Sequence, residues 1–130
     1  MTRRLDWQPR FEAVLAAWAR RPASWQATCV DFAVDVVAAV TGRDVGPSMP
    51  MRSARAVATT MRGVDAKTLT AAASAWLGAP VGCRQVRRGD IVEATADMAL
   101  GACLGDRVAF VGDGGLVIAP LHAAARGWQL

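Results

Sequence analysis

The segment "SWQATCVDFAVDVVAAVTGRDVG", residues 24–46, places Cys29 at the start of an apolar stretch. Apolar residues follow Cys29 at spacings of three and four as far as Val40, which is the pattern of a helix that buries one face. Gly42 comes next, and glycine is the residue that most readily leaves a helix in the left-handed conformation. The segment therefore predicts a helix from about Thr28 to Gly42, with Cys29 in its first turn.

Cys29 supports two interpretations. The partial positive charge at a helix N-terminus lowers the pKa of a thiol, and many nucleophilic cysteines are activated in this way. The carboxylate of Asp31 is close in sequence and acts in the opposite direction, because it disfavours a thiolate. Cys29 also shares a helix face with Ala33 and Val36, as a small buried core residue would. The sequence leaves both a nucleophile and a core cysteine open.

The N-terminal part of the chain has helical spacing throughout. Further helices are predicted at about 5–20, 52–63 and 65–78, with Asp65 as the N-cap of the last one and Gly78 after its final turn. A glycine and two prolines make residues 43–51 a loop.

From Gly89 the pattern changes to short segments rich in Val, Ile, Leu and Phe, separated by Gly and Asp. These segments are "GDIVEAT" (89–95), "MALGACLG" (98–105), "DRVAFVG" (106–112) and "GGLVIAPL" (114–121). They predict an antiparallel meander over about 89–120, with "GDGG" (112–115) as a tight turn. The expected fold is a single α+β domain of residues 1–130, in which helices from the part at about 5–78 pack on one face of the C-terminal sheet.

Composition excludes several classes of protein. The 130 residues are 53% hydrophobic and 20% charged, which argues against disorder, and no apolar run approaches the ~20 residues of a membrane span. Asp6, Arg10 and Glu12 interrupt the place where a signal peptide has its apolar segment. We therefore expect a soluble chain that is made in the cytoplasm and does not span a membrane.

The cysteines and the single histidine limit the chemistry. Cys29, Cys83 and Cys103 form no C-x-x-C pair, and an odd number of cysteines argues against a disulfide framework. We expect no metal site, because no C-x-x-C pair or His cluster has zinc-ligand spacing. We also expect no cofactor: the glycine-rich turn at 112–115 is followed by a predicted strand and not by the helix that a phosphate site needs. His122 is the single histidine, so a general base of the imidazole type within this chain has to be His122. The alternative is that His122 is an ordinary surface residue and has no catalytic role.

The surface residues suggest protein partners more than nucleic acid. The 14 arginines are distributed from Arg3 to Arg126 without a dense basic cluster, so we predict no nucleic-acid partner. Trp7, Trp25 and Trp128 lie at the ends of predicted elements, where tryptophan is often half-exposed and favoured in interfaces. These three residues are the candidate interface residues.

Several motifs in a fixed order resemble a known group of proteins. A tryptophan, then a cysteine that opens a helix, then "RRGDIV" (87–92) and "ALGACLG" (99–105) resemble the NlpC-type cysteine peptidases and amidases, whose fold is papain-like. Together with "DGGLVIAPL" (113–121) and "ARGWQL" (125–130), the helix starting at Cys29 resembles more closely a small domain family encoded among the tail genes of phages and prophages. This resemblance covers nearly the whole chain.

The resemblance implies roles for particular positions. Cys29 matches the nucleophile, and Gly89-Asp90 match the "GD" that begins the first strand of the sheet. The catalytic histidine of the NlpC type stands just before a strand like "VGIYLG", and that place is held here by Ala99. The acid before the cysteine is replaced by Thr28. A thiol without a base is a poor nucleophile in hydrolysis, so the resemblance implies an NlpC-like domain that has lost its activity.

The resulting hypothesis is a structural or assembly component of a bacteriophage tail, near the tail tip. Its partners are other tail proteins of the tip or hub, and its locations are the virion tail and, during assembly, the host cytoplasm. The alternative is an active cell-wall endopeptidase or amidase that cuts peptidoglycan during infection, with Cys29 as nucleophile and His122 as a relocated base. A third class is a regulatory or peptide-binding module that uses the former cleft as a groove.

Overall fold

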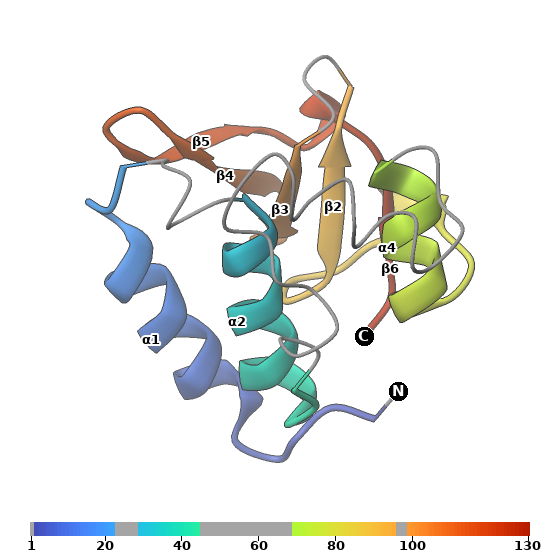
Figure 1. Ribbon diagram of the computed structural model, residues 1–130, viewed down its shortest axis with the longest axis horizontal. Coiled ribbons are helices and arrows are strands. Elements are labelled where there is room, and N and C mark those ends of the chain that lie inside the picture. Colours follow the sequence, from blue (N-terminus) through green and yellow to red (C-terminus); the bar gives the residue numbers. More distant parts are fainter. Residues whose placement is uncertain (1, 23–28, 45–68, 96–98) are drawn as a thin grey trace.

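A computed structural model describes residues 2–22, 29–44, 69–95 and 99–130. Three helices lie in these ranges: α1 (Trp7–Trp18), α2 (Cys29–Thr41) and α4 (Leu69–Leu77). Figure 1 shows α1 and α2 side by side below the sheet, with α4 at the end where β2 and β6 lie. The α+β class predicted from the sequence is confirmed.

The sheet has six antiparallel strands in the order β1-β6-β2-β3-β4-β5. Their bounds are β1 (Val81–Gly82), β2 (Ile91–Ala94), β3 (Leu100–Cys103), β4 (Arg107–Gly112), β5 (Gly115–Pro120) and β6 (Ala124–Trp128). The meander from β2 to β5 and its "GDGG" turn are confirmed, with Gly112 opposite Gly115. Two strands, β1 and β6, were not predicted. β6 lies between the edge strand β1 and β2, so the sheet is more than a meander.

The ends of α2 and α4 follow the predicted glycine signals. Gly42 has φ +75°, and its N–H donates to the carbonyl of Ala38 at 2.9 Å. Gly78 has φ +93° and donates in the same way to Ser74. These left-handed residues terminate the helices without a side-chain penalty. The helix predicted at 52–63, the N-cap Asp65 and most of the loop at 43–51 fall outside the described residues.

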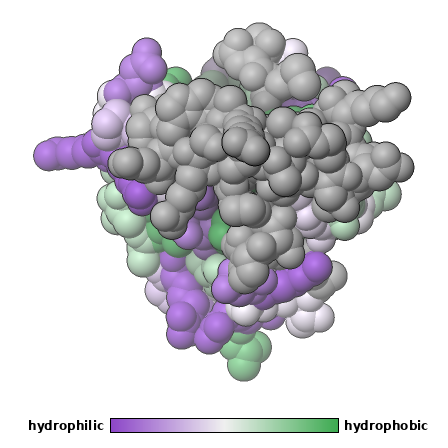
Figure 2. Space-filling view, in the orientation of Figure 1, coloured by the Kyte–Doolittle hydropathy of each residue, from purple (hydrophilic) through white to green (hydrophobic). Residues whose placement is uncertain are grey.

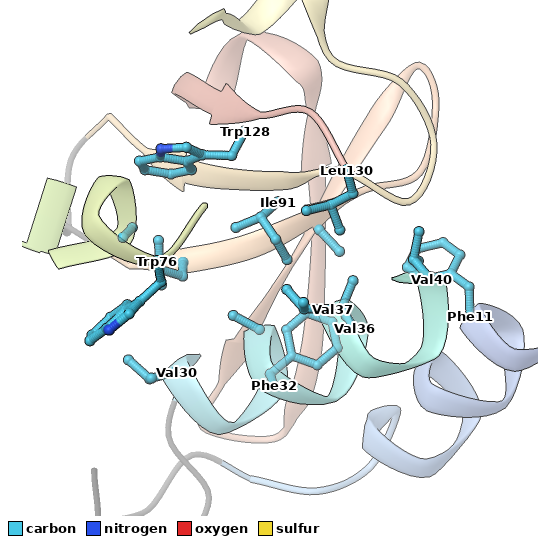
Figure 3. Packing of buried hydrophobic residues seen from close by; sticks show 14 of the residues in the cluster. Phe11, Val30, Phe32, Val36, Val37, Val40, Trp76, Ile91, Trp128 and Leu130 are labelled. Atoms are coloured by element: carbon cyan, nitrogen blue, oxygen red, sulfur yellow. The ribbon is translucent and has the colours of Figure 1, made fainter. Parts of the chain in front are cut away.

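Successive residues of β2 and β3 alternate between two packing clusters. Ile91 and Ala102 join the main core with the helices, whereas Val92 and Cys103 join a smaller cluster. Because neighbouring residues of a strand point to opposite faces, the two clusters lie on opposite faces of the sheet. Figure 3 shows side chains of α2, α4 and the sheet converging in the main core.

Trp128 is part of that main core, which corrects one sequence-based prediction. Its side chain is fully buried, and its indole N–H donates to the hydroxyl of Ser74 on α4. The reason is the central position of β6, which carries Trp128 into the sheet beside Ile91. Trp128 therefore serves packing and is not available as an interface residue.

Asp90, immediately before β2, is the best-connected buried polar group of the described chain. Its side chain is fully buried and pairs with the guanidinium of Arg3, with 2.7 Å between Nη2 and Oδ1. The backbone N–H groups of Leu130 and Arg87 donate to its two oxygens, each at 2.9 Å. The "GD" aspartate thus joins residues from both ends of the sequence to the first strand of the meander. We refer to Asp90, Arg3, Arg87 and Leu130 as the Asp90 centre.

Candidate functional site

Cys29 is the first residue of α2 and packs, partly buried, at the margin of the main core. The backbone of Leu100, the first residue of β3, contributes a hydrogen bond to the thiol. Residues on α2 and β3 are in contact along their length, and the sequence "CVDFAVDVV" explains this because its buried side chains repeat at helical spacing. The fold therefore places the Cys29 thiol against the start of β3.

The environment of Cys29 raises the pKa of its thiol. Burial is the largest cause, because a thiolate loses its hydration there, and the carboxylate of Asp31 raises the pKa further. Backbone hydrogen bonds from Leu100 and from the first turn of α2 act in the opposite direction. The net direction is upward, so the helix N-terminus does not activate the thiol and Cys29 is protonated at neutral pH.

Ala99 lies one residue before β3 and is bonded to Leu100, the residue whose backbone meets the thiol. Its carbonyl accepts a hydrogen bond from the N–H of Ala94 at 2.8 Å. The position where the NlpC resemblance places a catalytic imidazole is thus next to the residue that contacts Cys29. It carries a methyl group, which cannot accept a proton.

His122 lies in the short 3-10 turn η3 (Leu121–Ala123), and its side chain is exposed. Its neighbours Leu121 and Ala123 pack against the smaller cluster, on the face of the sheet opposite the main core. Cys29 packs against the main core. Within the described ranges the structure shows no hydrogen bond between the two residues, so the pair proposed for the peptidase alternative is not brought together.

The remaining predicted interface residues have different surroundings. Trp7 is half-buried, with the guanidinium carbon of Arg3 4.3 Å from the centre of its ring. Trp25 lies outside the described residues. With Trp128 in the core, Trp7 is the predicted interface residue that the structure shows with some exposed surface.

A narrow apolar pocket lies between α2, α4 and β3, and Ala33, one helical turn after Cys29, contributes to its wall. Its other walls come from residues that include Trp76 and Leu100, and its lining residues are all apolar. The indole N–H of Trp76 is buried without an acceptor among the described groups. The pocket has little more room than a water molecule needs, and its lining supplies no acid or base.

Glu93 is a polar residue that the sequence analysis did not identify. It is almost fully buried on β2, directly across the ladder from Leu100. The hydroxyl of Thr70 on α4 lies 2.7 Å from both carboxylate oxygens, and Arg126 lies 3.6 Å away. The signal in the sequence was a single acid within the apolar strand segment "IVEA" (91–94). Because its partners hold it in place, Glu93 attaches α4 to the sheet.

Two absences hold for residues 2–22, 29–44, 69–95 and 99–130, which the structure describes. No group of three or more His, Cys, Asp and Glu side chains in these ranges is arranged to hold a metal ion. None of the helices described has the combination of length and hydrophobicity that crossing a bilayer requires.

Comparison with models of protein families identifies the family of the chain. Residues 2–130 match the model of a domain of unknown function, DUF6950, so the chain belongs to that family. Neither the curated proteins nor the solved structures compared with the chain gave a match.

Proposed function

We propose that this member of the DUF6950 family is a non-catalytic structural or assembly component of a bacteriophage tail, at the tail tip, built on an NlpC-type, papain-like fold. The assignment to phage tails rests on the sequence resemblance described above. The observation that supports loss of catalysis is the environment of Cys29: a partly buried thiol with a raised pKa, next to a strand whose preceding residue is Ala99.

A cysteine hydrolase needs a thiolate or a base that generates one at the moment of attack. Burial and Asp31 disfavour the thiolate of Cys29, and the exposed His122 belongs to a turn on the other packing cluster. The polar groups with close partners, Asp90 and Glu93, bind other parts of the chain. The buried polar residues Asp90 and Glu93 therefore stabilise the fold. This role is the one expected in a domain that serves as part of a larger assembly.

The decisive experiment uses a host strain that carries this gene among phage or prophage tail genes. We would delete the gene, complement the deletion with wild type or with Cys29→Ala, and count infectious particles. The proposal predicts that the deletion stops tail assembly and that Cys29→Ala restores it fully. Mass spectrometry should find the chain in finished tails or in assembly intermediates. Absence from both would refute the tail assignment.

The peptidase alternative is tested with the same variants in vitro. Purified wild type, Cys29→Ala and His122→Ala would be incubated with muropeptides, and the products analysed by chromatography and mass spectrometry. Our proposal predicts no cleavage by any of them. Cleavage by wild type that disappears in both variants would establish the peptidase and contradict loss of catalysis.

A further inference from the structure

β5 carries two of the three large hydrophobic residues that are exposed in the described part of the chain. Val117 is 53% exposed and Ile118 is 48% exposed, and both lie on this six-residue strand, which contains no charged residue. β5 is the last strand in the sheet order and pairs with β4 alone. In the orientation of Figure 2, by contrast, the coloured part of the surface is a mosaic of hydrophilic and hydrophobic residues. An uncharged apolar edge strand is a template for pairing with another strand.

The register of β4 and β5 shows which backbone groups point outward. The N–H of Leu116 donates to the carbonyl of Ala19 at the end of α1, and not to β4. Pro120, opposite Arg107, has no N–H to offer to β4. Because antiparallel residues alternate between the two sides, Leu116, Ile118 and Pro120 all direct their backbone groups away from β4.

This leaves a short free edge with a defined hydrogen-bonding pattern. Leu116 is occupied by Ala19, and a Cβ on Gly115 would collide with the same carbonyl oxygen, so α1 closes the edge at that end. Beyond it, Ile118 offers an outward N–H that the backbone and side-chain hydrogen bonds of the described chain leave without an acceptor. Pro120 offers an outward carbonyl. The carbonyl of Ile118 points outward as well. The N–H of Ile118 and the carbonyl of Pro120, two residues apart, are complementary to the same two groups of a second copy.

We propose that β5 pairs with β5 of a second copy of this chain, antiparallel, with Ala119 on the two-fold axis. In this register the N–H of Ile118 donates to the carbonyl of Pro120 in the partner, and the symmetric bond forms in return. A pairing centred on Ile118 would also give two bonds, but it would direct Pro120 of the partner to the position that Ala19 occupies. The small side chain of Ala119 suits the axis, where facing residues are about 4.5 Å apart between Cα atoms.

The pairing buries the exposed apolar residues of the edge. Ile118 comes beside Pro120 of the partner, and Val117 comes beside Leu121 of the partner. The contact is three residues long, well below the ~1,200 Å² of a standard stable interface, so the dimer belongs to the weak, transient class. This inference rests on the geometry of β5 and stands independently of the proposed phage function.

The first test is the oligomeric state of the full chain, measured by sedimentation velocity from low micromolar to submillimolar concentration. We expect a reversible monomer–dimer equilibrium. Ile118→Pro removes the outward donor while leaving the ladder with β4 intact, and should weaken the dimer by about tenfold or more, the loss of two hydrogen bonds. Leu5→Lys removes another exposed apolar residue and should dimerise like wild type. A strictly monomeric wild type, or Ile118→Pro with unchanged dimerisation, overturns the proposal.

The second test reads the register directly and does not depend on Ile118→Pro folding. Under mild oxidation Ala119→Cys should give a dimer linked through position 119, because facing Cα atoms at that spacing can form a disulfide. Val117→Cys is the matched control, since the two copies of residue 117 are four positions apart in this register. Peptide mapping separates these links from any formed by Cys29, Cys83 or Cys103. Equal cross-linking of the two variants contradicts a two-fold axis at Ala119.

Discussion

The Asp90 centre and the surroundings of Cys29 are both places where the fold brings a polar group against the sheet, yet they are built differently. Asp90 is fully buried and receives the guanidinium of Arg3 and two backbone N–H groups. Cys29 receives a backbone hydrogen bond from Leu100, the residue after Ala99, and burial and Asp31 raise the pKa of its thiol. The aspartate of the "GD" motif thus has partners at both carboxylate oxygens, whereas the hydrogen bonds of the described residues give the predicted nucleophile no side-chain base.

This difference teaches that the two motifs have separate physical roles. An aspartate with partners from both ends of the sequence is needed for the fold, whether or not the domain catalyses a reaction. A cysteine without an acid–base partner can stay as a small core residue. The predictions below test that separation, starting with the largest expected effect.

Asp90→Ala should lower the free energy of unfolding by about 3–5 kcal/mol, because it leaves the buried guanidinium of Arg3 without a counter-charge. Urea denaturation followed by tryptophan fluorescence measures the loss. Asp6→Ala is the matched control, since Asp6 also pairs with an arginine, Arg10, but is half-exposed. If both variants lost the same small amount, the Asp90 centre would have no special role in stability.

Thr70→Val should cost about 1–3 kcal/mol, because the buried carboxylate of Glu93 loses the hydroxyl that lies within hydrogen-bond distance of both its oxygens. Valine has nearly the shape of threonine, so packing changes little. The double variant Thr70→Val with Glu93→Gln should recover part of the loss, since the buried charge is then absent. The single variant Glu93→Gln completes the comparison. If the stability lost by the double variant equalled the sum of the losses in the two single variants, the two side chains would not interact.

Alkaline pH should destabilise the protein through its buried thiols. Burial raises the pKa of Cys29, and it also raises that of Cys103, so both thiols ionise at lower pH in the unfolded chain than in the folded one. Stability is therefore highest below the ordinary thiol pKa of 9.0 and falls as the pH rises through the folded-state values. Cys29→Ala should make this fall shallower in urea titrations at several pH values. A thiolate-stabilising site would give the opposite slope.

Cys29→Ala should have the smallest effect at neutral pH, about 1 kcal/mol, as expected for removing one sulfur atom from a partly buried position. The measurement is the urea midpoint at pH 7, with Cys103→Ala as the comparison because Cys103 is fully buried on β3. Cys103→Ala should cost more. A larger loss in Cys29→Ala would indicate that the helix N-terminus depends on this side chain.

Local sequence signals predicted much of the fold, and their failures have physical causes. The apolar segments and glycines after Gly89 gave β2 to β5, because each strand has its own hydrophobic pattern and turn residues. β6 was missed because "AARGW" has low strand propensity and is held by pairing with β2 on one side and β1 on the other. That pairing is also why Trp128, expected at an interface, lies in the core.

The candidate site was predictable in part. The proximity of Cys29 to the start of β3 agrees with the order of motifs, and the effect of Asp31 on the thiol followed from its position in the first turn. The pairing of Arg3 with Asp90 was not predictable, because 87 positions separate the two residues and no local pattern links them. The partners of Glu93 also come from elements distant in sequence.

The most direct test of the central claim, that Cys29 is a partly buried thiol with a raised pKa and not an activated nucleophile, is its rate of alkylation. The folded protein would be treated with limiting iodoacetamide across a range of pH, and the modification of Cys29, Cys83 and Cys103 followed by mass spectrometry beside the urea-unfolded chain. The structure predicts that Cys29 reacts more slowly than in the unfolded chain and gains reactivity only at alkaline pH. Rapid, selective modification of Cys29 at neutral pH, with an apparent pKa below that of the unfolded chain, would contradict it.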